Sequence, residues 1–133
     1  MAEPRRILVV DDEIYILHIL EFSLSMEGYE VVTASDGNEA VKRLEECDPD
    51  MVVLDVMMPG LDGYAVCRQI RASDHLRSIP VILLSAKGRS VDREAGLEAG
   101  ADEYIVKPFS PRHLLERIRE LFESRQLDQA SSF

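Results

Sequence analysis

The sequence predicts an α/β domain in which a five-stranded parallel sheet carries helices on both faces. Five short apolar runs alternate with five segments of helical spacing along the chain. Such alternation predicts parallel strands joined by right-handed crossovers. The apolar runs lie at residues 7–10, 30–33, 51–54, 81–84 and 104–106, and three of them are continuously apolar, as strands buried on both faces must be. A length of 133 residues suits one domain of this kind.

The first helix follows the strand at 7–10 and precedes the strand at 30–33. Its apolar residues recur at the i, i+3, i+4 spacing of a buried stripe, formed by Ile16, Ile19, Leu20 and Leu24. Gly28 suits a C-terminal cap, because glycine accepts the left-handed backbone in which many helices end. The stripe and this cap predict a helix that ends just before Gly28.

The second helix begins after Ser35-Asp36-Gly37, which resembles a turn and an N-cap, and it runs to about Cys47 before Pro49. It connects the strand at 30–33 to the strand at 51–54.

The last three helices alternate with the strands at 81–84 and 104–106. The third follows Asp62-Gly63 and covers residues 64–72, and the fourth covers residues 90–99 before Gly100. The fifth begins at Pro111, a residue accepted in the first helical turn, and continues to about Ser124. We therefore predict one domain over residues 1–124, with residues 125–133 as a polar tail or the start of a linker.

The net charge of the chain is -10, from 25 acidic and 15 basic residues. This balance argues against direct binding of nucleic acid, because neutralising phosphates requires clustered Lys and Arg. The first apolar run has four residues, too few for a signal-peptide core or a membrane span, so we predict no membrane insertion and a cytoplasmic location.

Charged or hydroxyl residues follow four of the five predicted strands. They are Asp11, Asp12 and Glu13 after the first strand, Asp55 after the third, Ser85 after the fourth and Lys107 after the fifth. Ligands of such sheets bind outside the carboxyl ends of the strands. Alternatively, one of the first three acids could cap the following helix. Capping does not explain Asp55, because the next helix begins several residues later.

A pocket that gathers these carboxylates needs positive charge, because the carboxylates repel one another. Lys107 supplies one charge, and Mg²⁺ suits a site with few carboxylates, several waters and a phosphate. Asp12 is the better direct metal ligand, and Asp11 either acts through water or shares the ligation. A carboxylate can attack phosphorus to form an acyl phosphate. Asp55, alone after a central strand, is the expected nucleophile.

The residues at these strand ends resemble the receiver domain of two-component response regulators over residues 5–124. The resemblance rests on Asp11-Asp12-Glu13, the stretch DVMMPGLDG from Asp55 to Gly63, Ser85-Ala86-Lys87, the stretch GADEY from Gly100 to Tyr104, and Lys107-Pro108-Phe109. Four motifs at the correct strand ends are far more specific than any one of them.

The resemblance implies a flavodoxin-like fold of strand order 2-1-3-4-5. It makes Asp55 the phosphoacceptor, Asp11 and Asp12 the acidic pair, and the backbone carbonyl of Met57 the third protein contact to Mg²⁺. It further makes Ser85 the switch hydroxyl that binds a phosphoryl oxygen and Lys107 the phosphate-binding lysine. The family's Lys-Pro bond is usually cis. Tyr104 takes the place of the aromatic residue that swings inward with the switch, although an edge position in the sheet would also suit it.

The family takes its phosphoryl group from a histidine kinase or a phosphotransfer protein. Ile14 and Leu17 point away from the stripe that we expect to be buried in the first helix. These two residues either lie at a helix edge against a loop or form a docking surface for the kinase helices.

The family's output surface is formed by the fourth helix, the fifth strand and the fifth helix, where many DNA-binding members dimerise through charge pairs. Arg93, Asp102, Glu103 and Arg117 resemble part of that pattern, and His113 stands where an acidic partner is often found. A homodimer formed on phosphorylation, or a downstream effector protein, is therefore the expected output partner.

Two other classes fit the sequence less well. An aspartyl-phosphate hydrolase of the haloacid dehalogenase type needs a second Asp two residues after the nucleophile, where this chain has Met57. A flavin-binding module needs a phosphate loop after the first strand, where acids would repel the ligand. We expect a signalling domain rather than an enzyme, one that catalyses its own phosphorylation and slow dephosphorylation. It is either a stand-alone regulator or an excised receiver.

Overall fold

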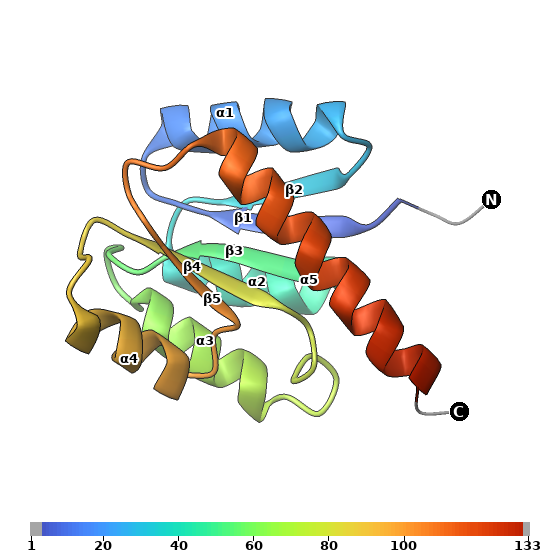
Figure 1. The fold of residues 1–133 in the computed structure, drawn as a ribbon. Coiled ribbons are helices and arrows are strands. Elements are labelled where there is room, and N and C mark those ends of the chain that lie inside the picture. The colour runs from blue at the N-terminus through green and yellow to red at the C-terminus, as the bar shows by residue number, and fades with distance from the viewer. Residues whose placement is uncertain (1–3, 132–133) are drawn as a thin grey trace.

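The structure, a computed structural model, describes the backbone of residues 4–131 and the side chains of residues 4–124 (Figure 1). Five strands alternate with five helices along the chain. The elements are β1 Arg6–Val10, α1 Ile14–Met26, β2 Glu30–Ala34, α2 Gly37–Cys47, β3 Met51–Asp55, α3 Gly63–Ala72, β4 Val81–Ser85, α4 Ser90–Glu98, β5 Glu103–Val106 and α5 Pro111–Ser131.

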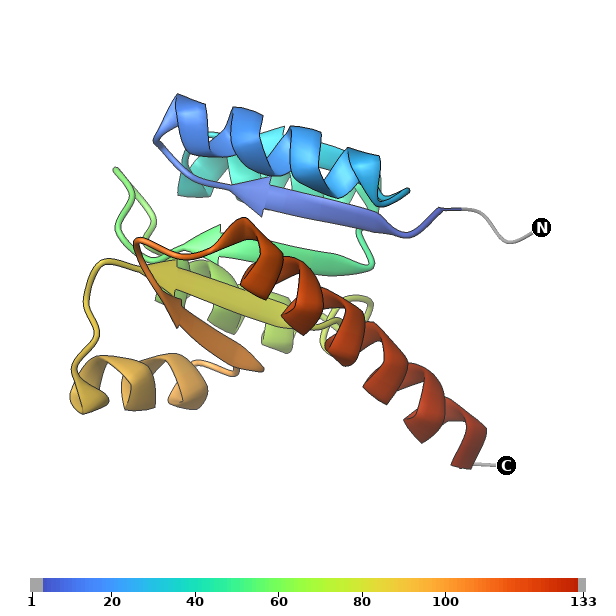
Figure 2. The same ribbon diagram turned by 45° about the horizontal axis from the view of Figure 1, so that its top comes forward.

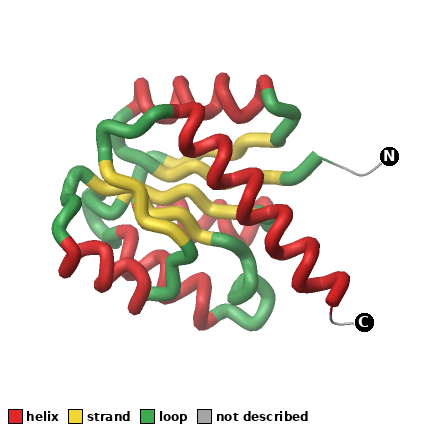
Figure 3. Tube along the Cα trace, viewed as in Figure 1, coloured by secondary structure: helices red, strands yellow, loops and turns green. Residues whose placement is uncertain are grey.

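The five strands form one parallel sheet in the order β2-β1-β3-β4-β5. This confirms the predicted fold class and the strand order that the family resemblance implied. Figure 2 shows the arrowheads of β1, β3 and β4 at the same edge of the sheet, and Figure 3 shows the loops at this edge that connect the strands to the following helices. Residues that follow the strands are therefore neighbours in space.

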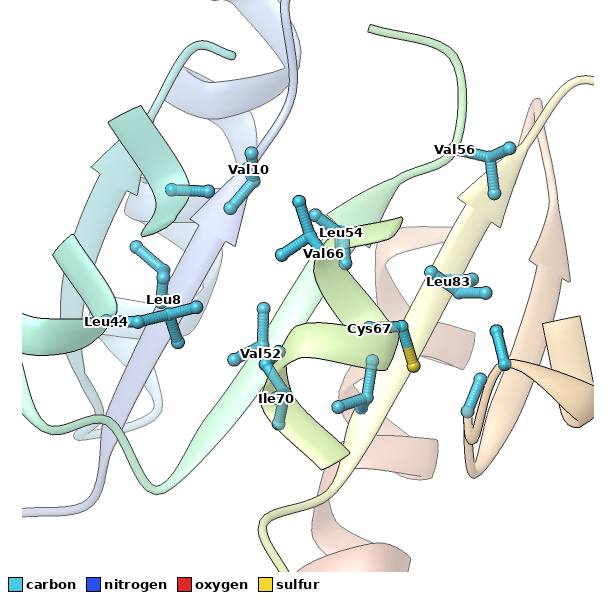
Figure 4. Packing of buried hydrophobic residues seen from close by; sticks show 14 of the residues in the cluster. Leu8, Val10, Leu44, Val52, Leu54, Val56, Val66, Cys67, Ile70 and Leu83 are labelled. Atoms are coloured by element: carbon cyan, nitrogen blue, oxygen red, sulfur yellow. The ribbon is translucent and has the colours of Figure 1, made fainter. Parts of the chain in front are cut away.

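Two hydrophobic cores lie on opposite faces of the sheet, because successive side chains of a strand point to opposite sides. Ile7 and Val9 of β1 pack with buried residues of α1 and α5. Leu8 and Val10 pack on the other face, where α2 and α3 cover the sheet. Figure 4 shows the second core, with side chains of the strands meeting Val66 and other residues of α3. The sheet is thus covered on both sides, as its apolar strands require.

The predicted helix boundaries agree with the backbone at several capping positions. The side chain of Asp36 accepts a hydrogen bond from the Glu39 amide at 2.7 Å, and that of Asp62 accepts one from the Ala65 amide at 2.9 Å. Gly28 and Gly100 adopt φ values of 93° and 105° directly after the ends of α1 and α4. These four residues therefore perform the helix-capping roles that their types favour.

The buried stripe of α1 differs from the predicted one. Leu17 is 7% exposed and packs in the core with Leu20 and Leu24, whereas Ile19 is 49% exposed and Ile14 is 66% exposed. α1 carries apolar residues around most of its circumference, so helical spacing alone permits two overlapping stripes. The prediction that Leu17 points away from the core is wrong, and Leu17 is a core residue.

Helix α5 continues to Ser131 and does not end near Ser124 as predicted. Residues 125–131 contain no Gly or Pro, so nothing in this segment interrupts a helix that has already formed. Figures 1 and 2 show the end of α5 projecting beyond the sheet. The predicted tail over residues 125–133 is thus helical where the structure describes it, and residues 132–133 lie outside the described part.

No helix among the described residues is both long and apolar enough to span a membrane.

Arg71, at the end of α3, holds together the end of the sheet at which the strands begin. Its Nη2 lies 2.9 Å from Asp102 Oδ2, and its other guanidinium nitrogens donate to the carbonyl oxygens of Gly100, Arg77 and Ile79. Asp102 Oδ2 also accepts a hydrogen bond from the Val81 amide at 2.8 Å. This arrangement ties α3 to the starts of β4 and β5.

We predict that Arg71→Ala lowers the free energy of unfolding by about 2–4 kcal/mol, because partly buried carbonyl groups and a carboxylate lose their partner. Urea unfolding followed by circular dichroism measures this loss. Arg68→Ala is the matched control, because Arg68 is exposed on the same helix. An equal effect of the two substitutions would contradict the role given to Arg71.

Candidate functional site

Three carboxylates from distant parts of the chain meet at the ends of the neighbouring strands β1 and β3. Asp11 and Asp12 follow β1, and Asp55 is the last residue of β3. Ligand oxygens of the three residues all lie within 4.8 Å of one another. Asp11 is completely buried and Asp55 is 4% exposed, whereas Asp12 is exposed. Two of the three charges are therefore held out of water, where their mutual repulsion is strongest.

Lys107 extends from the end of β5 into this acidic cluster. Its Nζ lies 2.8 Å from Asp11 Oδ2, 3.3 Å from Glu13 Oε1 and 3.5 Å from Asp55 Oδ2. Burial lowers the pKa of Lys107, but the hydrogen bond and charge of Asp11, together with Asp55 and Glu13, leave the pKa above its usual value. Lys107 is therefore held as an ammonium group shared by three carboxylates. Its peptide bond to Pro108 is cis.

Asp55 is left with too little positive charge to be fully ionised at neutral pH. Burial, and then the negative charge of Asp11, raise the pKa of Asp55 to about 7, although Lys107 acts in the opposite direction. Hard divalent cations prefer such carboxylate oxygens as ligands. The donor set of Asp11, Asp12 and Asp55 therefore fits a divalent cation, whose charge would complete the neutralisation that Lys107 begins.

Helix capping does not account for the acids at the start of α1. Glu13 occupies the N-cap position and makes no side-chain cap hydrogen bond. Asp11 Oδ1 accepts a hydrogen bond from the Glu13 amide at 2.9 Å, ahead of the helix, while Asp11 Oδ2 faces Lys107. Asp62 caps α3, so Asp55 has no capping role either.

Gly63 lies beside the site, although the sequence indicated it only as a residue before the third helix and as the end of the stretch that begins at Asp55. A Cβ atom at this position would lie 2.5 Å from the carbonyl oxygen of Asp55, which is closer than real Cβ atoms approach backbone. The Gly63 amide donates to the Val56 carbonyl at 3.0 Å. α3 therefore packs directly against the backbone of Asp55, and only glycine permits this approach.

Ser85 and Tyr104 both contact Lys87, which lies in the segment joining β4 to α4. Ser85 is completely buried, and its Oγ accepts a hydrogen bond from the Lys87 amide at 3.0 Å. Tyr104 is 2% exposed, and its hydroxyl donates to the Lys87 carbonyl at 2.7 Å. Tyr104 lies on the edge strand β5, beneath this segment, and its role as a switch residue stays a prediction. A short chain of hydrogen bonds therefore connects Ser85 to Tyr104.

Glu13 and Tyr15 also belong to the surroundings of the site. Glu13 accepts a hydrogen bond from the Tyr15 hydroxyl while its other oxygen faces Lys107. The pKa of Glu13 is lowered, first by the bond from Tyr15 and then by Lys107. Both residues line a groove of about 440 Å³ between α1 and the segment that joins β5 to α5. Sequence reasoning missed Tyr15, because its hydroxyl meets Glu13 only once the helix has formed.

Other residues singled out from the sequence lie at the margin of the site or outside it. The amide nitrogen of Met57 is 3.4 Å from Asp55 Oδ1, and Met57 is 53% exposed. A metal contact of the Met57 carbonyl stays a prediction. His18, His75 and His113 are all exposed, and His75 pairs with Asp48 at 2.6 Å.

We predict that Asp55→Asn stabilises the chain in the absence of divalent cations, and more so at pH 8 than at pH 5. A carboxyl whose pKa rises from 3.8 in the unfolded chain to about 7 in the folded chain costs stability progressively as the pH passes from 4 to 7. Between pH 5 and 8 the added gain is on the order of 2 kcal/mol. Thermal unfolding in a chelator at both pH values measures it.

Asp74→Asn is the control for this measurement, because the side chain of Asp74 is fully exposed. A gain for Asp55→Asn that does not depend on pH would contradict the charge repulsion assigned to Asp55.

Comparison with known proteins gives the chain a family. The model of the response regulator receiver domain matches residues 7–119. Probable transcriptional regulator ycf27 of Cyanophora paradoxa is 58% identical over 117 residues, which cover 88% of this chain and 48% of that relative. The alkaline phosphatase synthesis transcriptional regulatory protein PhoP of Bacillus subtilis is 45% identical over 128 residues, which cover 96% of this chain and 52% of PhoP. The chain spans about half the length of these curated relatives.

A solved structure resembles the fold closely. It is the receiver domain of sensor histidine kinase PA1611 from Pseudomonas aeruginosa PAO1, described with a magnesium ion coordinated in the active site cleft. It is 35% identical, with a TM-score of 0.81, and the match covers 89% of this chain and 97% of that one. The family match and these relatives confirm the resemblance seen in the sequence: the chain belongs to the response regulator receiver domain family.

Proposed function

We propose that this chain accepts a phosphoryl group on Asp55 from a histidine kinase or a phosphotransfer protein. The observation that carries the proposal is the position of Asp55, whose buried carboxylate lies 3.5 Å from Lys107 and within reach of the oxygens of Asp11 and Asp12. A nucleophile, an ammonium group and metal-binding oxygens are the parts that phosphoryl transfer requires.

In the proposed reaction, a carboxylate oxygen of Asp55 attacks the phosphorus of a phosphohistidine. The new O–P bond forms as the N–P bond breaks, and the electron pair of that bond stays on the imidazole nitrogen of the donor. Lys107 binds one oxygen of the transferred group, and the hydroxyl of Ser85 donates to another. When bound by Asp11, Asp12, Asp55 and the Met57 carbonyl, Mg²⁺ supplies positive charge that keeps Asp55 ionised and neutralises the phosphoryl oxygens.

The same contacts suggest how phosphorylation reaches the output face formed by α4, β5 and α5. The Ser85 hydroxyl accepts from the Lys87 amide, and the Lys87 carbonyl accepts from Tyr104. A phosphoryl group that draws Ser85 toward Asp55 would shift this segment and release or reposition Tyr104. We propose Ser85 and Tyr104 as the switch residues on this ground.

Charged residues of the output face are engaged within the chain. Arg117 Nη2 lies 2.6 Å from Glu103 Oε2, and Arg93 donates to the Tyr104 carbonyl at 3.1 Å. A homodimer through this face, proposed for the phosphorylated state, would have to share or exchange these pairs. The alternative proposal is that a downstream effector protein binds the same face.

An apolar stripe on α1 supports the docking of kinase helices beside Asp55. Ile14, Tyr15, Ile19, Phe22 and Met26 are all exposed, from 49% for Ile19 to 72% for Met26. Tyr15 and Ile19 also line the groove next to Lys107. A kinase helix that covers this stripe would deliver its phosphohistidine at the adjacent acidic cluster. Ile14 is exposed and can belong to such a surface, whereas Leu17 is buried and has no part in it.

We predict that Mg²⁺ and acetyl phosphate add one phosphoryl group to the chain, and that Asp55→Asn abolishes this addition. Intact-mass spectrometry measures the product. Asp50→Asn is the control, because Asp50 lies directly before β3, at the end opposite Asp55. An unmodified parent chain, or the same product from the Asp55 variant, would overturn the proposed function.

We predict that a chain with Ile19→Ser and Phe22→Ser takes its phosphoryl group at least about 10-fold more slowly from a phosphorylated kinase that serves the parent chain. The reason is that the kinase would bury both apolar side chains on docking, and these contacts are lost. The rate with acetyl phosphate stays unchanged. Val91→Ser, at an exposed residue of α4, is the control. Equal slowing with both donors would remove the docking role from α1.

A further inference from the structure

Helix α4 has little apolar contact with the rest of the domain. Gly96 is the one buried residue between Ser90 and Glu98, a segment whose side chains the structure describes in full. The larger apolar residues of this helix point outward, with Val91 57% exposed and Leu97 54% exposed. The N-cap residue, Arg89, makes no side-chain cap hydrogen bond. Since apolar burial supplies most of the stability of a docked helix, polar contacts weigh more heavily in α4 than elsewhere.

Tyr104 of β5 provides the first set of these contacts. Its hydroxyl donates to the Lys87 carbonyl just before α4, and Arg93 of α4 lies over its ring at 5.5 Å. A Cβ atom on Gly96 would lie 2.9 Å from the ring, so α4 rests directly on this aromatic face. The position of α4 therefore depends on Tyr104 staying beneath it.

Tyr64 of α3 provides a second set that the proposed switch does not use. Its hydroxyl donates to the Asp92 carbonyl, in the first turn of α4, at 3.2 Å. Burial, and then the neighbouring Tyr104, raise the pKa of Tyr64 to about 12. The ring packs against the core beneath the sheet. The Tyr64 phenol thus joins α3 to α4.

We propose that Tyr64 is a second positioning residue of the switch, which holds the first turn of α4 to α3 and must let go before α4 can move. The proposal rests on the proposed function, in which α4 belongs to the output face. Tyr104 sits on β5 and Tyr64 on α3, so the two hydroxyl groups hold the segment before α4 and the first turn of α4 from two different elements. Loss of one grip leaves α4 partly restrained, and loss of both frees it.

Hydrogen–deuterium exchange of residues 87–99 in the unphosphorylated chain tests this role. Tyr64→Phe removes only the hydroxyl, so the packing of the ring remains. We expect exchange in this segment to become about 2- to 10-fold faster, as the loss of one ordinary hydrogen bond allows. Tyr29→Phe is the matched control, because Tyr29 packs against Phe122 on the other face of the sheet. Unchanged exchange in Tyr64→Phe, or an equal increase in Tyr29→Phe, would overturn the proposal.

Phosphorylation by acetyl phosphate with Mg²⁺ separates this role from the proposed function. Tyr64→Phe should take up the phosphoryl group as the parent chain does, but phosphorylation should accelerate exchange at residues 87–99 by a smaller factor, because one restraint is already gone. An equal factor in both chains would overturn the role of Tyr64 in switching. A parent chain that takes up no phosphoryl group would instead overturn the proposed function, while exchange in the unphosphorylated chains still decides whether Tyr64 holds α4.

Discussion

Electrostatic repulsion among the acids at the end of the sheet is the constraint on which the other features of the site depend. Asp11 and Asp55 are buried within 4.8 Å of each other, and Lys107 is shared between them and Glu13. Folding therefore holds Asp55 where burial and the charge of Asp11 raise its pKa. Apolar packing on both faces of the parallel sheet keeps them there. The result is a pocket whose negative charge exceeds the single positive charge of Lys107, so a bound cation would lessen the imbalance.

The two ends of the strands differ in how their charged residues are paired. Where the strands begin, Arg71 lies at hydrogen-bonding distance from a carboxylate and several carbonyl oxygens. Its charge has an opposite partner and its guanidinium nitrogens have acceptors. At the carboxyl ends of the strands, Lys107 faces more negative charge than it can neutralise. The unmatched charge is thus confined to the carboxyl ends of the strands.

The sequence was sufficient for the features that depend on order along the chain. Strand positions, the capping residues Asp36 and Asp62, and the gathering of Asp11 near Asp55 all follow from periodicity and from the geometry of parallel sheets. It was insufficient where two arrangements have the same spacing, as for Leu17 and Ile19 in α1. It was also insufficient where a contact depends on the approach of distant elements. The pairing of Arg71 with the start of β4 and the bond from Tyr64 to α4 leave no pattern in the sequence.

The close approach of Gly63 to the Asp55 backbone has a mechanical consequence. Because the start of α3 abuts the carbonyl of Asp55, α3 cannot slide along β3 without displacing this residue. The position of α3 is therefore fixed relative to Asp55, whereas α4 has a single buried residue, Gly96. Tyr64 stands next to Gly63 in the sequence, so the residue that bonds to α4 belongs to the same turn of α3 that contacts the Asp55 backbone. One turn of helix thereby connects Asp55 to the start of α4.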